Sequence, residues 1–347
     1  MTTCAARALR LACGALLPIL GASACDFPTS LPRFETQFGI PLDATTLSVS
    51  QFLPAGVTVT ASSFQVTVAP SSSQRTLAQM CAPCSGLDGM QVPKPAFTDV
   101  FQVVVALPQD LVSAEVVSGT VNVTVSHNLG FDPVRPAGST QGGVILVVVR
   151  SGGREVGRDS ITGTFTQPVT RSMGMLPGPV TGSLVAEVTI VSPAGNPVTI
   201  NNSSSISVVV APGTVVASAA QVQVQNRQVS ADALVLDLTN VDADLRGRVQ
   251  RATLLLNVAN PLTVGGTLEL RLHAPGVADI RRSVQVGPGV SILRVELSQE
   301  DVRGLLGQTV NVSLTGPVNA TAGPVTVRPS DVVTITPRLN LVLEIGS

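Results

Sequence analysis

Short runs of alternating apolar and polar residues follow one another along most of the chain. Val, Ile and Thr dominate these runs, and Gly, Pro, Asn and Ser separate them, as is typical of strands joined by turns. The clearest runs are Val57 to Ala69, Val100 to Leu107, Val116 to Ser126, Val144 to Arg150, Leu184 to Val191, Ile206 to Val210, Ala233 to Leu238, Ala252 to Ala259, Thr267 to His273 and Val332 to Ile345. The pattern predicts an all-β chain of many short antiparallel strands.

Helical signals are few. Ser298 is followed by acidic residues and by the apolar stretch Val302 to Leu306, which predicts one short capped helix. Residues Gln74 to Met80 favour one further helical turn.

The chain also contains a weak internal repeat. Val116 to Leu129 parallels Val249 to Leu262, and each segment is followed by a Gly-Gly pair and another strand. Leu184 to Ile200 parallels Leu306 to Val327 in the same way. The spacing of about 120 to 130 residues is close to the length of one β-sandwich.

This repeat predicts tandem Ig-like antiparallel β-sandwiches that arose by internal duplication. We place the first at residues 97–225 and the second at residues 226–347. One larger sandwich built by duplication is the alternative. Residues 25–96 then form an N-terminal tether and a loop-rich β segment.

The first 24 residues have the features of a secretory signal peptide. Arg7 and Arg10 precede an apolar stretch from Leu11 to Leu20, and the small residues of 21–24 follow it. The apolar stretch is too short for a transmembrane helix. The sequence therefore predicts export.

Cys25 directly after these small residues resembles the lipobox of bacterial lipoproteins. The resemblance implies cleavage before Cys25, diacylation of its thiol and a membrane anchor in a bacterial cell envelope. Ala22 departs from the Leu, Val or Ile that this family prefers three residues before the Cys. Ordinary cleavage after Ala24, which leaves Cys25 as a free or paired thiol, is the alternative.

A second resemblance concerns the strand that ends in Asn260-Pro261. It is similar to the strand that marks WHy-type late-embryogenesis-abundant β-sandwich domains, although the first repeat has Asn128-Leu129 at this place. The resemblance implies a compact, non-catalytic sandwich associated with the envelope or with stress protection.

Cys81-Ala82-Pro83-Cys84 is the sharpest chemical motif in the chain. Two thiols at this spacing can form a disulfide, act as a redox couple or supply half of a metal site. Ser85 stands where haem attachment needs His, the flanks favour a loop, and no further Cys or His lies nearby. In an exported protein we expect a structural disulfide that closes the long loop between Ala69 and Phe97.

Other candidate residues favour ordinary structural roles. His127 and His273 lie near strand ends, and no G-x-S-x-G motif accompanies them, so we expect neither to be catalytic. The loop around Asn240 lacks the Gly and Glu of a calcium site, and we expect the arginines after it to form a solvated strand edge. The methionines that could in principle select Cu(I) are Met80, Met90, Met173 and Met175. We expect no cofactor and no enzyme activity.

The composition narrows the classes of function that remain for this protein. A net charge of -1 and the absence of Trp and Tyr exclude a basic, aromatic surface for nucleic acid. We expect a non-catalytic envelope lipoprotein that acts as a structural or binding module, with an envelope protein or polymer as its partner. The mean hydropathy of +0.40 leaves a carrier of an apolar or lipid ligand as the alternative. A thiol redox or metal-handling protein that uses Cys81 and Cys84 is the second alternative.

Overall fold

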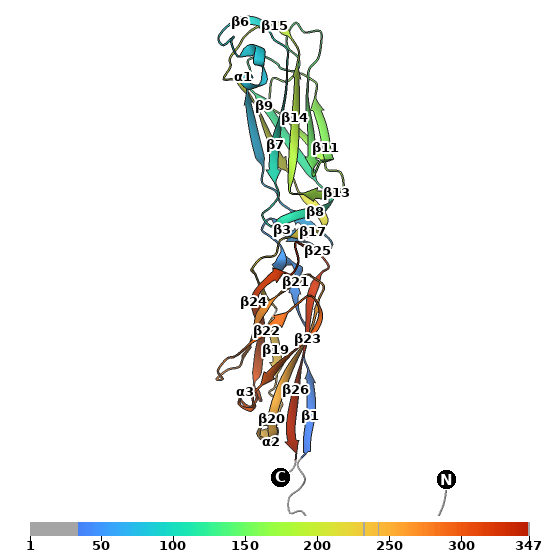
Figure 1. Ribbon diagram of the computed structural model, residues 1–347, viewed down its shortest axis with the longest axis vertical. Coiled ribbons are helices and arrows are strands. Elements are labelled where there is room, and N and C mark those ends of the chain that lie inside the picture. Colours follow the sequence, from blue (N-terminus) through green and yellow to red (C-terminus); the bar gives the residue numbers. More distant parts are fainter. Residues whose placement is uncertain (1–33, 232, 242, 346–347) are drawn as a thin grey trace, which may run out of the picture.

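The computed structural model describes residues 34–231, 233–241 and 243–345. The signal peptide and Cys25 lie outside the described residues. The described chain forms an elongated body in which two β-sandwiches lie end to end along the long axis, with a further sheet between them (Figure 1). The expected all-β class of antiparallel sandwiches is confirmed.

The upper sandwich contains two four-stranded sheets, β11-β10-β14-β7 and β12-β9-β16-β5. Its strands are β5 (Ser71–Thr76), β7 (Phe97–Ala106), β9 (Thr120–His127), β10 (Val144–Ser151), β11 (Arg154–Ile161), β12 (Val169–Gly174), β14 (Ser183–Ser192) and β16 (Ser205–Pro212). Counted one to eight along the chain, they run 5-4-7-2 in one sheet and 6-3-8-1 in the other. This is the strand order of a jelly roll, which differs from the Ig-like order that the sequence suggested.

The lower sandwich repeats this order. Its strands are β1 (Phe34–Pro41), β2 (Thr45–Ser48), β18 (Arg227–Ser230), β19 (Leu234–Asp237), β20 (Val249–Asn260), β21 (Val264–His273), β22 (Ile280–Val286), β23 (Gly289–Leu297), β24 (Thr309–Ala320) and β26 (Val332–Ile345). Strands β1 and β2 both pair with β26, and β18 and β19 both pair with β24. With each of these two pairs counted as one broken strand, the sheets again run 5-4-7-2 and 6-3-8-1.

The repeat seen in the sequence joins equivalent strands of the two sandwiches. Val116 to Leu129 contains β9 and Val249 to Leu262 contains β20, each the third strand of its unit. The parallel between Leu184 to Ile200 and Leu306 to Val327 joins the seventh strands, β14 and β24. The two sandwiches therefore share their strand order as well as the weak sequence repeat.

The expected boundaries at residues 97 and 226 leave out the first strand of each unit. In the lower sandwich this strand is β1, whose Phe34 pairs with Ile345 at the other end of the chain. The upper sandwich is thus inserted between β2 and β18, and residues 34–96 do not form a segment of their own. The pairing of β1 with β26 joins residues from opposite ends of the described chain, and it therefore leaves no local sequence pattern from which it could be predicted.

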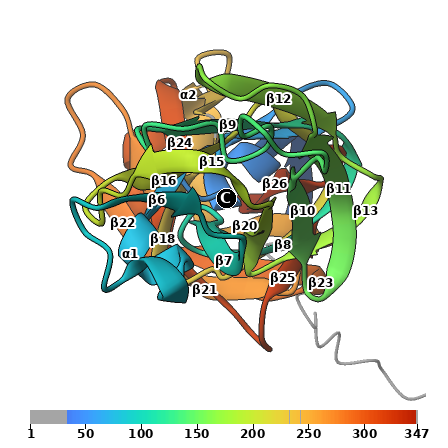
Figure 2. The ribbon, with the colours of Figure 1, turned by 90° about the horizontal axis from the view of Figure 1, so that it is seen from above.

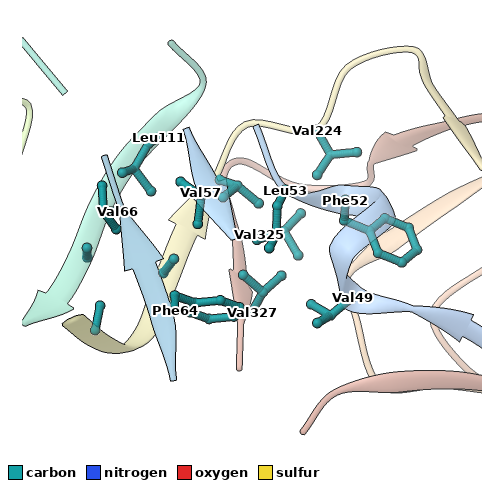
Figure 3. Packing of buried hydrophobic residues seen from close by; sticks show 14 of the residues in the cluster. Val49, Phe52, Leu53, Val57, Phe64, Val66, Leu111, Val224, Val325 and Val327 are labelled. Carbon is teal, nitrogen blue, oxygen red and sulfur yellow. The ribbon is translucent and has the colours of Figure 1, made fainter. Parts of the chain in front are cut away.

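A six-stranded sheet, β13-β8-β17-β4-β3 with β25 on β17, joins the two sandwiches. Its strands are β3 (Val57–Val59), β4 (Phe64–Val66), β8 (Leu111–Ser118), β13 (Gly178–Thr181), β17 (Val215–Val222) and β25 (Val325–Val327). Figure 3 shows Phe64 of β4 packed beside Val327 of β25, with Phe52 on the neighbouring turn. All three residues are buried in one apolar cluster that extends into both sandwiches, so the joint is packed continuously with their cores.

The helices are short. They are α1 (Leu77–Met80), α2 (Ala243–Arg248), α3 (Gln299–Leu305) and the 3-10 turns η1 (Val49–Phe52) and η2 (Ala82–Cys84). The expected capped helix is α3, where the Ser298 hydroxyl accepts from the Asp301 N–H at 3.1 Å. The expectation of a solvated, charge-paired strand edge at Arg246, Arg248 and Arg251 is wrong for the first two, because both lie in α2. Arg251 does lie on a strand, β20, and pairs with Glu35 at 3.5 Å. In the described ranges, no helix is long and apolar enough to cross a membrane.

Candidate functional site

The upper end of the body, which we call the tip, consists of residues 77–95, 130–142 and 193–202. It carries α1, η2 and a two-stranded ribbon of β6 (Gln91–Lys94) and β15 (Gly195–Thr199) (Figure 1). Figure 2 looks down on this end. β1 begins and β26 ends at the opposite, lower end of the body (Figure 1). The tip is therefore the part of the described chain that lies farthest from Phe34.

Cys81 and Cys84 lie in the tip, with their sulfur atoms at disulfide distance and their Cα atoms 5.2 Å apart. A capping box starts α1 just before them, since the Thr76 N–H donates to the Gln79 side chain at 2.9 Å. Both cysteines are buried. A thiol reagent or a redox partner could reach these sulfur atoms only after the tip opens.

The loop after the cysteines is held by backbone and side-chain hydrogen bonds. The Gly89 N–H donates to the Ile200 carbonyl at 2.9 Å, and the Ile200 N–H donates to the Met90 carbonyl at 3.0 Å. The Asn202 N–H donates to Asp88 at 2.8 Å, and its side-chain amide donates to the Ser85 carbonyl at 3.0 Å. The loop is thus tied on both sides, and the cysteine pair is one of several restraints.

Lys94 is the residue of the tip that sequence reasoning missed. Its side chain is 1% exposed, and its ammonium donates to the carbonyl oxygens of Pro193 and Pro95. The ammonium also lies 5.1 Å from the ring centre of Phe97 and 5.2 Å from that of Phe131. Burial lowers the pKa of Lys94 to about 8, although the charge of Asp132 opposes this shift.

One signal in the sequence could have pointed to this residue. Lys94 is the only lysine in the chain and lies between Pro93 and Pro95. A single lysine in a chain whose other 20 basic residues are all Arg, in a segment whose prolines leave carbonyl groups without backbone partners, indicates a specific structural position.

The two histidines have different surroundings. His127 lies at the end of β9, where its Nε2 contacts the Phe165 carbonyl at 2.6 Å and its Nδ1 accepts from the Leu129 N–H at 3.3 Å. Both ring nitrogens are therefore used by the backbone, so His127 has no nitrogen left for a substrate. His273 contacts the Asp279 carboxylate at 2.7 Å on the lower sandwich, far from the cysteines along the body.

The other candidate residues are scattered. Met80 is buried in α1 at the tip, whereas Met173 and Met175 are buried near the joint. Asn240 precedes α2 in the lower sandwich. Among the described residues, no group of three or more His, Cys, Asp or Glu side chains could hold a metal ion.

The interior of the lower sandwich leaves little room for a ligand. An apolar cavity between its two sheets has a volume of about 20 Å³. Its lining includes Leu234, Leu256 and Leu270. A space of this size holds about one water molecule. An apolar or lipid ligand does not fit there.

No protein-family model and no curated protein matches this chain. A protein from Parabacteroides distasonis ATCC 8503, described as secreted, is similar in structure with 9% identity and a TM-score of 0.35, over 88% of this chain and 99% of that one. The tandem domain CBM22-1-CBM22-2 of Paenibacillus barcinonensis Xyn10C has 8% identity and a TM-score of 0.19, over 87% of this chain and 98% of that one. For the N-terminal domain of the Streptococcus gordonii adhesin Sgo0707 the values are 10% and 0.20, over 91% of each chain. All three TM-scores lie below 0.5.

Proposed function

We propose that this protein is an exported lipoprotein of a bacterial cell envelope that acts as a non-catalytic spacer and binding module. One observation carries the proposal: the described chain begins and ends at the same end of an elongated body, opposite the tip (Figure 1). Phe34, where the described chain begins, is only nine positions after Cys25.

The anchor and this geometry fit together. Nine residues span at most about 30 Å when fully extended. A diacylated Cys25 would therefore keep the lower sandwich close to the bilayer and hold the tip away from it. The apolar core is continuous through the joint, and we expect this close packing to limit bending between the two sandwiches. The tip would then stay at a set distance from the bilayer.

A contact function fits the chemistry of the described residues better than the two alternatives. The cavity of about 20 Å³ speaks against a lipid bound between the sheets of the lower sandwich. The burial of both Cys81 and Cys84 speaks against thiol redox or metal chemistry. What the body offers is a large, rigid surface of strands and a tip of ordered loops.

The anchor is tested by expressing the full chain and its Cys25→Ser variant in a bacterium that processes lipoproteins. We expect the parent protein in the membrane fraction, with a mature mass that begins at Cys25 and carries the added acyl groups. The Cys25→Ser variant should lose the acyl mass and leave the membrane fraction. A Cys81→Ser/Cys84→Ser variant is the matched control and should stay in the membrane.

A parent protein whose mass shows no acyl group would overturn the lipoprotein assignment. Stoichiometric lipid that leaves the purified protein on denaturation, without a covalent link, would favour the carrier instead. A thiol pair that is freely alkylated in the folded parent protein would favour redox chemistry.

A further inference from the structure

One outer face of the upper sandwich is unusually apolar. Strand alternation in the sheet β11-β10-β14-β7 points every second side chain away from the core. On three of its strands, half of these outward positions hold Val or Leu: Val100 and Val104 of β7, Val185 and Val191 of β14, and Val144, Leu146 and Val148 of β10. Val100, Val104 and Val191 are 50%, 54% and 39% exposed, whereas Val148 is only 3% exposed. We call these seven residues the valine face.

A charged residue lies in the middle of the valine face. The register places the half-buried Glu187 of β14 between Gln102 of β7 and Val148 of β10. Among the described residues, Glu187 forms no ion pair. A carboxylate at the centre of an apolar surface favours a partner that brings a cation to this point, because an unpaired charge would be costly to cover.

A second copy of this chain can supply this cation. Arg150 also points outward, on β10 opposite Val185, and lies one outward position along the strand from Val148. The valine face thus carries both members of a charge pair, side by side across the boundary between β10 and β14. A twofold axis along this boundary brings Glu187 of one copy over Val148 of the other. The second copy's Arg150 then lies about 7 Å further along its strand, within reach of the Glu187 carboxylate.

The rest of the face is self-complementary under the same axis. Val191 pairs with Val144 in the sheet and would lie over the second copy's Val144. Thr189 would similarly lie over Leu146. Apolar side chains therefore meet apolar or small neighbours, and the ion pairs occur twice around the axis.

We propose that the valine face is the interface of a parallel homodimer, with Glu187 of each copy paired with Arg150 of the other. The strands of this sheet run along the long axis of the body, so the twofold axis does too (Figure 1). Both lower ends then point the same way. This orientation rests on the proposed function, since two copies anchored through Cys25 to one membrane must also point the same way.

The size of the face sets the strength of the dimer. Four strands of about ten residues cover about 20 Å by 30 Å. This is less than the roughly 800 Å² per partner of a standard interface, so we expect a weak dimer that forms mainly when the copies are concentrated on a membrane.

The experiment measures dimer dissociation of the full-length protein in detergent by analytical ultracentrifugation, for the acylated parent and for the Cys25→Ser variant. We expect Glu187→Arg and Arg150→Glu each to weaken the dimer about tenfold or more, and the double reversal to restore it to near the parent value. Val104→Lys should weaken it as well. Val290→Lys is the matched control, because Val290 is exposed on the lower sandwich, and it should have no effect.

The following results would support or overturn the dimer interface. A protein that stays monomeric at 100 μM in detergent and does not crosslink in vesicles overturns the interface, as does a dimer that is indifferent to the charge reversals. If Val104→Lys fails to fold, Val100→Lys takes its place. Dimerisation of the Cys25→Ser variant with the same charge pattern supports the interface even if acylation is absent. Spin labels at position 90 in the tip should lie close together in the dimer, and widely separated labels would overturn the parallel orientation.

Discussion

Gln51 and Ser230 are joined by two hydrogen bonds across 179 positions of the chain. The Gln51 amide donates to the Ser230 carbonyl at 2.8 Å, and the Ser230 N–H donates to the Gln51 side-chain oxygen at 2.7 Å. These two residues mark where the chain leaves the lower sandwich in η1 and where it returns in β18. The pair thus closes the insertion of the upper sandwich at its base.

The stability of the joint beside this pair should depend on the Phe64 side chain, which is fully buried in the apolar cluster of Figure 3. We expect Phe64→Ala to lower the free energy of unfolding by about 3 to 5 kcal/mol, because it leaves a cavity in a packed core. Denaturant unfolding measures this change. Phe38→Ala is the control, since Phe38 is 48% exposed and should lose much less. Equal losses for the two variants would contradict a packed joint.

Lys94 should make stability rise in alkaline solution. Its folded pKa of about 8 lies below its ordinary value of 10.5. Between these values the unfolded chain holds the Lys94 proton while the folded chain has released it, so the free energy of unfolding increases with pH. The full increase, reached above pH 10.5, is at most about 3 kcal/mol.

Few other side chains of this protein titrate in this range, because it has no Tyr and no second Lys. Denaturant unfolding between pH 7.5 and 10.5 should show the rise in the parent protein. Lys94→Met removes the titrating group and should flatten the profile over the same range. A parent protein whose stability is constant or falls across this range would show that the ammonium is not desolvated.

The cysteine pair should add a modest amount of stability. A disulfide between Cys81 and Cys84 closes a loop of four residues, for which loop entropy gives about 2 kcal/mol. We expect Cys81→Ala/Cys84→Ala to lose about this much in denaturant unfolding and to keep the fold. The parent protein should resist alkylation until a reductant is added to unfolded protein. Rapid alkylation of the native protein without reductant would show that the pair is reduced.

Asp279 should make the lower sandwich sensitive to acid. Hydrogen bonds from His273 and then from Arg271 lower the pKa of the Asp279 carboxyl. A lowered carboxyl pKa contributes stability above the unfolded value, and this contribution is lost as the pH falls through the folded value. We expect Asp279→Asn to lower Tm near pH 7, and the difference from the parent to shrink below pH 4. A difference that stays constant down to pH 2 would mean that charge is not its cause.

Part of the tip was also predictable. The spacing of Cys81 and Cys84 pointed to a close pair in a loop, and the structure places their sulfur atoms at disulfide distance. The surroundings of Lys94 were not predictable, because Pro193 and Phe131 come from distant segments and meet it only after the sandwich has closed. The same holds for the valine face, since the register of three strands decides which valines share a side.

By itself the sequence determined the secondary structure of this protein and its duplication. Period-two alternation of Val, Ile and Thr depends on neighbouring residues, and β26 occupies Val332–Ile345 as that pattern predicts. Only the tertiary structure decided that β1 completes the lower sandwich and that the upper one is inserted after β2. An edge strand takes its partner from whatever backbone and apolar surface lies free after folding, and the pairing of Phe34 with Ile345 therefore has no counterpart in local sequence.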